Sequence, residues 1–149
     1  MLPETNPRLE LFKSFIGKNL SESLSPMGAW LNGTVKDVQA TSITVEYVVR
    51  RDMSNPMNVL HGGCASAIMD DIVGMLVFAL GREYGYTSIN LNCDFLSPAF
   101  TGDTITATTN VIRAGKNVIH CEAKIVSVQG KIIAKCATNL GITTVKIPF

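Results

Sequence analysis

Polar and apolar positions alternate along much of the second half of the chain, which predicts a series of β-strands. Turn-forming residues separate four such segments: TSINLNCDFLSP, DTITATTNVIR, NVIHCEAKIVSV and KIIAKCATNLGITTV. In the first half, SITVEYVVR alternates in the same way, and we interpret AWLNGTVKDVQ before it as its antiparallel partner strand. We therefore expect a largely antiparallel sheet of five or six strands.

In two segments, apolar residues recur at the spacing that is typical of helices. The longer one, HGGCASAIMDDIVGMLVFAL at residues 61–80, is apolar on most sides and predicts a buried helix. The shorter one lies within residues 1–20 and predicts an amphipathic helix on the domain surface. Its apolar face consists of Leu9, Phe12, Phe15 and Ile16. One central helix lying across an antiparallel sheet is an α+β fold, and 149 residues are enough for a single domain with its own core.

Composition and charge narrow the class of function. The formal net charge is +1 and charged residues make up 17% of the chain, without a long run of one sign. This gives no electrostatic footprint for nucleic acid or for an anionic membrane surface, so neither is expected as a partner. The N-terminal segment lacks the basic start and apolar run of a signal peptide, and we expect a cytoplasmic protein.

The four cysteines are far apart in the sequence and include no C-x-x-C pair. They are Cys64, Cys93, Cys121 and Cys136. This spacing favours reduced, buried thiols over a disulfide framework or a zinc site, and we expect no metal.

Two consecutive acids, Asp70 and Asp71, interrupt the long apolar helix. An ionised carboxylate in apolar surroundings costs several kcal/mol unless it is paired, hydrogen-bonded or protonated. At helical spacing, the neighbours of Asp70 are small: Gly63, Ser66, Ala67 and Gly74. The neighbours of Asp71 are bulkier: Cys64, Ile68, Met75 and Phe78. Asp70 therefore has room for an approaching substrate or another chain, whereas a structural hydrogen bond is favoured for Asp71.

His61, Gly62 and Gly63 stand at the start of the long helix. Because glycines lack side chains, a ligand can reach backbone N–H groups at the positive end of the helix dipole, so Gly63 is a candidate substrate contact. The same residues can instead form a tight turn that His61 caps. His61 and Asp70 are nine residues apart, which is roughly 13 Å along a helix axis. If both act on one bound atom, two subunits must share the site.

Five features, in this order, carry a resemblance to a known family: NPMNVLHGG, an Asp nine residues after its His, SINLNCDFLSP, GD and RAGK. Together they resemble the hotdog-fold acyl-CoA thioesterases of the phenylacetate-pathway (PaaI-like) type, in the 4-hydroxybenzoyl-CoA thioesterase superfamily. The resemblance covers residues 27–144, the hotdog core of one domain over residues 1–149. It implies a long central helix wrapped by the sheet. It also implies homodimers with a continuous sheet and active sites at the subunit interface, and often tetramers.

The resemblance also assigns roles to individual residues. Asp70 takes the place of the catalytic carboxylate, which activates water as a general base or attacks the thioester carbonyl directly. The backbone N–H of Gly62 would hold the thioester oxygen as it gains charge. Asn55 would lie near the thioester, and His61 would position groups at the same loop. The implied substrate is an acyl- or aryl-acyl-CoA, with coenzyme A as part of the substrate and no separate cofactor.

Ser88 falls where the family has a hydroxyl that orients the nucleophilic water, although an ordinary strand serine is equally compatible with the sequence. Alternation along YTSINLNCDF groups Ser88 with Asn90, Asn92 and Asp94 on a polar face. If the opposite, apolar face covers the helix, Ser88 reaches Asp70 only through a bulge or across the dimer.

Coenzyme A carries phosphates, which suit basic residues near a turn. Arg113 and Lys116 in RAGK are the candidates, although a solvated turn lysine is the commoner finding. The second acid, Asp71, is expected to act electrostatically on its neighbour or to bind a basic group elsewhere.

Two other functions fit the same fold. A hotdog dehydratase or hydratase needs a differently placed histidine, and neither His61 nor His120 supports it. A non-catalytic acyl-CoA-binding module would keep the fold, but retention of Asn55, His61, Gly62 and Asp70 together argues for catalysis. A Cys121–His120 nucleophile is disfavoured because strand neighbours point to opposite faces.

Overall fold

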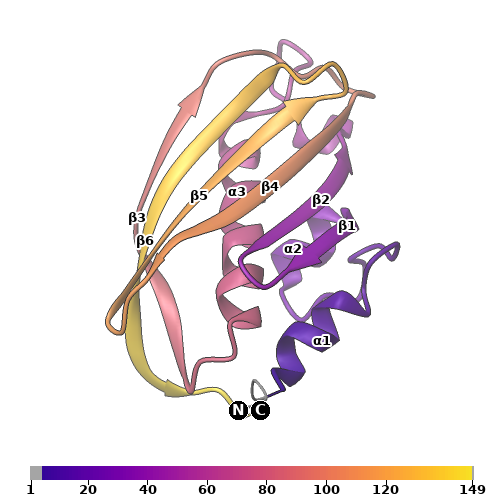
Figure 1. Cartoon of the computed structure of the whole chain (residues 1–149). Helices are drawn as coiled ribbons and strands as arrows, with labels where there is room; N and C mark the ends of the chain where they lie inside the picture. Colours follow the sequence, from indigo (N-terminus) through magenta and orange to yellow (C-terminus); the bar gives the residue numbers. More distant parts are fainter. Residues whose placement is uncertain (1–4, 149) are drawn as a thin grey trace.

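A six-stranded antiparallel sheet wraps around one long helix in the computed structural model, which describes residues 5–148 (Figure 1). The strands are β1 (Thr34–Gln39), β2 (Ser42–Val48), β3 (Tyr84–Phe95), β4 (Thr104–Ala114), β5 (Val118–Ser127) and β6 (Ile132–Lys146). They follow the order β1-β2-β4-β5-β6-β3, and every neighbouring pair is antiparallel. The predicted α+β hotdog arrangement is confirmed, with six strands.

The central helix, α3 (Gly62–Ala79), supplies much of the core. Ile68, Ile72 and Leu76 on α3 are fully buried, and each such side chain contributes about 1.5–3 kcal/mol when it leaves water. The alternation in β2 places Ile43, Val45 and Tyr47 against the same core. Among residues 5–148, α3 is the one helix long and apolar enough to cross a membrane by composition, and here half of it is buried within the domain.

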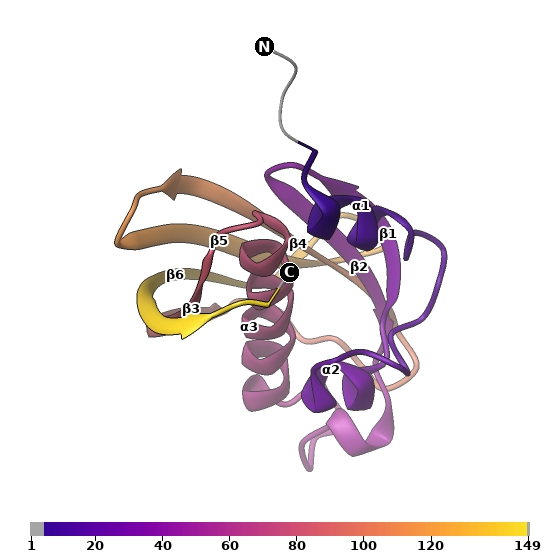
Figure 2. The same cartoon turned by 90° about the horizontal axis from the view of Figure 1, so that it is seen from below.

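Seen from below, the sheet curls around α3, and α1 and α2 lie toward its β1–β2 side (Figure 2). Helix α1 (Pro7–Lys13) is shorter than the predicted surface helix, which also included residues 1–4, outside the described range. The chain turns at Ser14, and Gly17 has a φ of 85° that ends regular helix. Of the predicted apolar face, the first three residues pack against the core, but Ile16 lies beyond the helix and is 45% exposed. The prediction for Ile16 is therefore wrong.

The start of the predicted strand AWLNGTVKDVQ is also wrong, because its first three residues end a short helix, α2 (Pro26–Leu31). Ser25 caps this helix by accepting the Gly28 N–H at 3.1 Å, and Pro26 occupies its first turn. Asn32 then adopts a left-handed conformation with a φ of 51°, which ends α2 before β1 begins. The local capping residues outweigh the apolar pattern that favoured a strand.

Strand β3 contains a bulge that changes which side chains face α3. Ser88 pairs with Leu140 and Asn90 pairs with Asn139, so β3 has one more residue than β6 between these pairs. Before the bulge Ser88 points toward α3, and after it Leu91 packs against the core. The prediction that Ser88 and Asn90 share one face is therefore wrong, because the extra residue shifts the alternation.

Candidate active site

Asp70 of α3 and Ser88 of β3 meet at an open part of the surface. The Ser88 hydroxyl donates a hydrogen bond of 3.1 Å to Asp70 Oδ1. The β3 bulge turns Ser88 inward, which is the first of the two routes considered from the sequence. Both residues are exposed, so a substrate can reach the second oxygen of the Asp70 carboxylate. The Ser88 hydroxyl holds Asp70 Oδ1. Asp70 Oδ2 is left to accept a proton or to attack a carbon atom.

The N-terminus of α3 presents a free backbone N–H. His61 is the N-cap residue, and its Nδ1 accepts the Gly63 N–H at 2.8 Å. The Gly62 N–H has no acceptor within residues 5–148, and the Phe95 ring packs beside Gly62. At the positive end of the helix dipole, Gly62 is the better anion donor of the two glycines. Because His61 already uses the Gly63 N–H, a substrate-binding role for Gly63 stays a prediction that requires His61 to turn away.

Asn55 shapes the loop that leads into α3. Its Oδ1 accepts the N–H groups of Met57 at 3.0 Å and Val59 at 3.4 Å, and its own N–H donates to the Val59 carbonyl. Two further bonds, from Leu60 N–H to Ala99 O and from His61 N–H to Met53 O, anchor the end of this loop. In this chain Asn55 therefore supports the backbone that positions His61.

These groups do not converge within one chain. Gly62 and Asp70 are eight residues apart on one straight helix, a separation of about 12 Å along its axis. A thioester carbonyl held at Gly62 is out of reach of Asp70 in the same α3. Within one chain, Gly62 and Asp70 are thus two separate groups at different places on α3.

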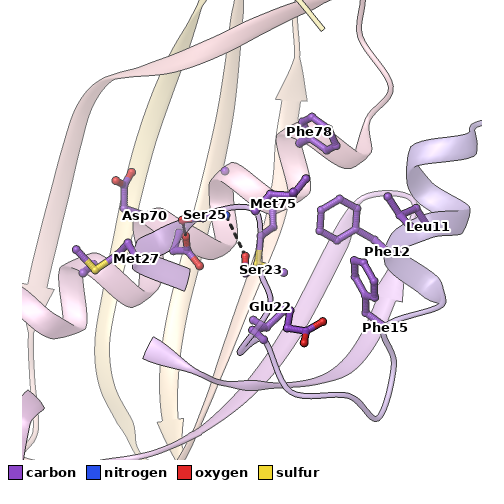
Figure 3. Close-up of a pocket in the computed structure, with 15 residues that line it drawn as sticks. Leu11, Phe12, Phe15, Glu22, Ser23, Ser25, Met27, Asp70, Met75 and Phe78 are labelled. Carbon is purple, nitrogen blue, oxygen red and sulfur yellow. Dashed lines mark hydrogen bonds between the residues drawn. The ribbon is translucent and has the colours of Figure 1, made fainter. Parts of the chain in front are cut away.

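A cavity of about 640 Å³ lies beside Asp70, between α3, α1 and the segment 20–27 (Figure 3). In Figure 3, Asp70 and Met27 are at one end, and Phe12 and Phe15 are at the other. Phe12 packs edge-on against both Phe15 and Phe78, with ring centroids 5.7 and 5.9 Å apart. The volume suits a small-molecule ligand, and the lining is mostly apolar.

The sequence identified only part of this lining. Met75 and Phe78, which the sequence marked as bulky neighbours of Asp71, also line the cavity. The segment 20–27 was missed because it has neither helical nor strand periodicity, and only the structure brings it over α3.

Asp71 has a structural environment. The Ser25 hydroxyl donates to Asp71 Oδ1 at 2.9 Å, so the acid holds the N-cap of α2, and no basic group among residues 5–148 pairs with it. Its Oδ2 is buried without a partner, and so is the hydroxyl of Tyr47. Burial, opposed by the Ser25 hydrogen bond and reinforced by the charge of Asp70, raises the pKa of Asp71. The hydrogen bond from Ser25 is the structural role that the sequence favoured for Asp71.

The predicted phosphate contacts lie at the other end of α3. Arg113 lies at the end of β4 and Lys116 in the β4–β5 turn, and both are exposed. Arg82 donates to the Ala114 and Gly115 carbonyls, and the Tyr86 hydroxyl donates to the Lys116 carbonyl. The structure therefore does not bring Arg113 and Lys116 to Gly62 of the same chain, and their contact with coenzyme A stays a prediction.

Three of the four cysteines are poor nucleophiles, and no cysteine is among the described residues that line the cavity. All four are free thiols, and Cys121 and Cys136 are buried. Burial raises the pKa of Cys64 to about 11 and that of Cys136 to about 12. Such thiols are protonated at neutral pH and react slowly, which leaves the carboxylate of Asp70 as the candidate group at the cavity.

Sequence comparison relates the chain to thioesterases. A family model described as "Thioesterase superfamily" matches residues 57–134. Acyl-coenzyme A thioesterase 13 of Homo sapiens is 30% identical over 74 residues, which make up 50% of this chain and 53% of that protein. The chain thus spans about half the length of the curated relatives it matches.

Solved structures share the fold. The Escherichia coli PaaI protein, from the phenylacetic acid degradation operon, has a TM-score of 0.81 and 20% identity, covering 95% of this chain and 98% of that one. A phenylacetic acid degradation-related putative thioesterase from Ralstonia eutropha is 28% identical, with a TM-score of 0.73 over 82% of this chain and 93% of that one. A hypothetical thioesterase from Streptococcus pneumoniae, solved with coenzyme A, has a TM-score of 0.72 and 18% identity, covering 78% and 89%.

Proposed function

The chain belongs to the thioesterase superfamily, and we propose that it hydrolyses the thioester of an acyl-coenzyme A to a free acid and coenzyme A. The observation that carries the proposal is the hydrogen bond from Ser88 to Asp70 at the mouth of an apolar cavity. It supplies a fixed, accessible carboxylate beside space for an acyl group. Coenzyme A is part of the substrate, so the reaction needs only water.

The chemistry starts from a water molecule on the free oxygen of Asp70. The carboxylate takes a proton from the water, whose oxygen attacks the thioester carbonyl carbon. The carbonyl oxygen becomes an oxyanion and accepts the Gly62 N–H at the N-terminus of α3. The C–S bond then breaks, and the thiolate of coenzyme A receives the proton from Asp70. Direct attack by Asp70 would instead form an anhydride that water hydrolyses.

The two halves of the site are completed by a second copy of the chain. Asp70 lies against β3, which is an edge strand of the sheet and carries exposed Ile89 and Phe95. An edge strand of this length pairs readily with another strand, so we propose a homodimer joined along β3, and tetramers of such dimers. Asp70 of one subunit would then act with Gly62 of the partner subunit.

The cavity favours an uncharged acyl chain. The described residues that line it include three carboxylates, Glu22, Asp70 and Asp71, and no basic side chain. A distal carboxylate on the acyl group would be repelled and left without a counter-ion. The remaining lining is mainly apolar and aromatic, which stabilises an alkyl or aryl group by burial.

The test is release of free thiol from a panel of short, medium, long and aryl acyl-CoA substrates. Asp70→Asn keeps the shape of the side chain but cannot accept a proton, so hydrolysis should fall by at least about a hundredfold. Binding of a non-hydrolysable acyl-CoA analogue should survive. Asp71→Asn is the matched control and should keep most of the turnover. Loss of turnover in Asp71→Asn but not in Asp70→Asn would contradict the assignment, and binding without any turnover in the parent would indicate a non-catalytic module.

A further inference from the structure

The β3 bulge is held by a polar network on the outer face of the sheet. Strands β5, β6 and β3 are neighbours in that order (Figure 1). Ile119 and Cys121 on β5 are fully buried, so His120 between them points to the outer face. Asn139 of β6 pairs with His120 in register and lies on the same face. Asn90 of β3 pairs with Asn139 and follows directly after the extra residue of the bulge, so His120, Asn139 and Asn90 lie side by side across three strands.

Asn90 uses both of its carbonyl oxygens to bind β6. Its side-chain Oδ1 accepts the backbone N–H of Asn139 at 3.0 Å and the Asn139 Nδ2 at 3.2 Å. Its main-chain carbonyl accepts the hydroxyl of Thr138 at 2.7 Å. Asn139 Oδ1 faces His120 Nδ1 at 2.8 Å, so this ring nitrogen carries the hydrogen and fixes the orientation of the Asn139 amide.

The network substitutes for a bond that the bulge removes. An extra residue in β3 interrupts the ladder, and a strand N–H that is shielded from water and left without an acceptor destabilises the fold. The Asn90 side chain provides that acceptor for Asn139 at this one position. The extra residue also turns Ile89 outward over Gly141, where a Cβ would approach Ile89 Cδ1 to 3.1 Å, so glycine at 141 accommodates it.

A shift of the bulge by one residue would turn Ser88 to the other face of the sheet, away from Asp70. We infer that Asn90, supported by Asn139 and His120, is a positioning residue that fixes the bulge and thereby holds Ser88 on Asp70. The inference rests on the proposed thioester hydrolysis. Asn90 does not touch the substrate, because it lies on the face of β3 opposite to α3.

The test is a double-mutant cycle between Asn90 and Ser88, with kcat and KM measured by thiol release from one acyl-CoA. Ser88→Ala and Asn90→Ala should each lower kcat by roughly tenfold and leave KM within about twofold, because carboxylate orientation is lost and substrate binding is not. The double variant should lose no more than Ser88→Ala alone, since both act through one hydrogen bond. Asn90→Asp keeps the acceptor oxygen and should restore most of kcat.

Asn92→Ala is the matched control, because Asn92 is exposed on the same strand and its side chain has no hydrogen-bond partner within residues 5–148. It should keep the parent kinetics. Should Asn90→Ala not fold, His120→Phe replaces it in the same cycle and is judged by the same criterion.

Three results would overturn the inference: losses that multiply in the double variant, a parent-like kcat in Asn90→Ala, or an equal loss in Asn92→Ala. A parent protein that hydrolyses acyl-CoA and depends on Asp70, yet gives one of these results, would overturn the positioning role alone. A parent without hydrolysis would overturn the proposed function itself.

Discussion

Asp70 and Asp71 are adjacent in sequence and have opposite surroundings. Asp70 is exposed and accepts one hydroxyl, from Ser88. Asp71 is half-buried, accepts the Ser25 hydroxyl, and has one oxygen without a partner. The bulk of their neighbours at helical spacing was enough to predict this difference from the sequence. The partner of Asp71 was not predictable, because Ser25 is 46 residues away and caps a helix with no visible periodicity.

The raised pKa of Asp71 makes stability depend on pH. An acid whose pKa is higher in the folded state than in the unfolded state binds more protons when folded. The stability that protonated Asp71 contributes is fully present below the pKa of the unfolded state. It is lost as the pH rises through the pKa of the folded state. Ionised Asp71 is therefore a cost to the folded protein at neutral pH.

Asp71→Asn should remove this cost and keep the hydrogen bond from Ser25, because the amide oxygen still accepts it. We expect the variant to unfold at a higher temperature than the parent at pH 7, with the difference shrinking toward pH 4 as the parent acid becomes protonated. Thermal unfolding at both pH values measures this. Asp71→Ala, which loses the Ser25 bond, should be less stable than Asp71→Asn at both. A larger advantage of Asp71→Asn at pH 4 than at pH 7 would contradict the assignment.

At the scale of elements, α3 forms one wall of the cavity, and α1 with the segment 20–27 forms the other. Gly74 lies on the α3 wall one helical turn from Asp70, and a Cβ built on it meets nothing within 4 Å. The missing side chain leaves space along the cavity between Asp70 and the phenylalanines. If the cavity takes the acyl chain of the substrate, as proposed, Gly74 sets in part the length that fits.

Gly74→Leu should shorten the usable cavity without harming the fold. Leucine is a better helix former than glycine by on the order of 0.5–1 kcal/mol, so stability should hold or rise. We expect kcat/KM to fall by about tenfold or more for long acyl-CoA substrates and to stay within about twofold for acetyl-CoA. Gly74→Ala should give a smaller change in the same direction. An equal loss across all chain lengths would show that Gly74 does not border the acyl site.

The helices and strands were largely predictable from the sequence where apolar residues recur with a period of two or 3.6 over many residues. The four C-terminal strands and α3 follow such patterns, and their bounds agree with the structure within a few residues. Helix α2 was missed because six residues give fewer than two turns of pattern. The bulge was missed because alternation along β3 contains no signal for an extra residue, whose position depends on Asn139 and His120 in other strands.

At the scale of the whole molecule, the site for the proposed hydrolysis is incomplete within a single chain. Gly62 and Asp70 are held about 12 Å apart by the rigid α3, and the edge of β3 beside Asp70 is unpaired within residues 5–148. From the spacing of His61 and Asp70, the sequence predicted that two subunits share the site if both residues act on one bound atom. The proposed reaction therefore uses the loop of Asn55 and Gly62 from one chain and Asp70 from another.

Mixed dimers test whether two chains share one site. Asn55→Ala damages the loop before α3, Asp70→Asn removes the carboxylate, and each variant alone should be nearly inactive. After verified subunit exchange of equal amounts, half of the dimers contain one variant of each kind, and one of their two sites combines an intact Asn55 loop with an intact Asp70. Thiol release should then recover to about a quarter of the parent rate. No recovery after exchange would contradict a shared site, because it would put Asn55 and Asp70 in the same subunit's site.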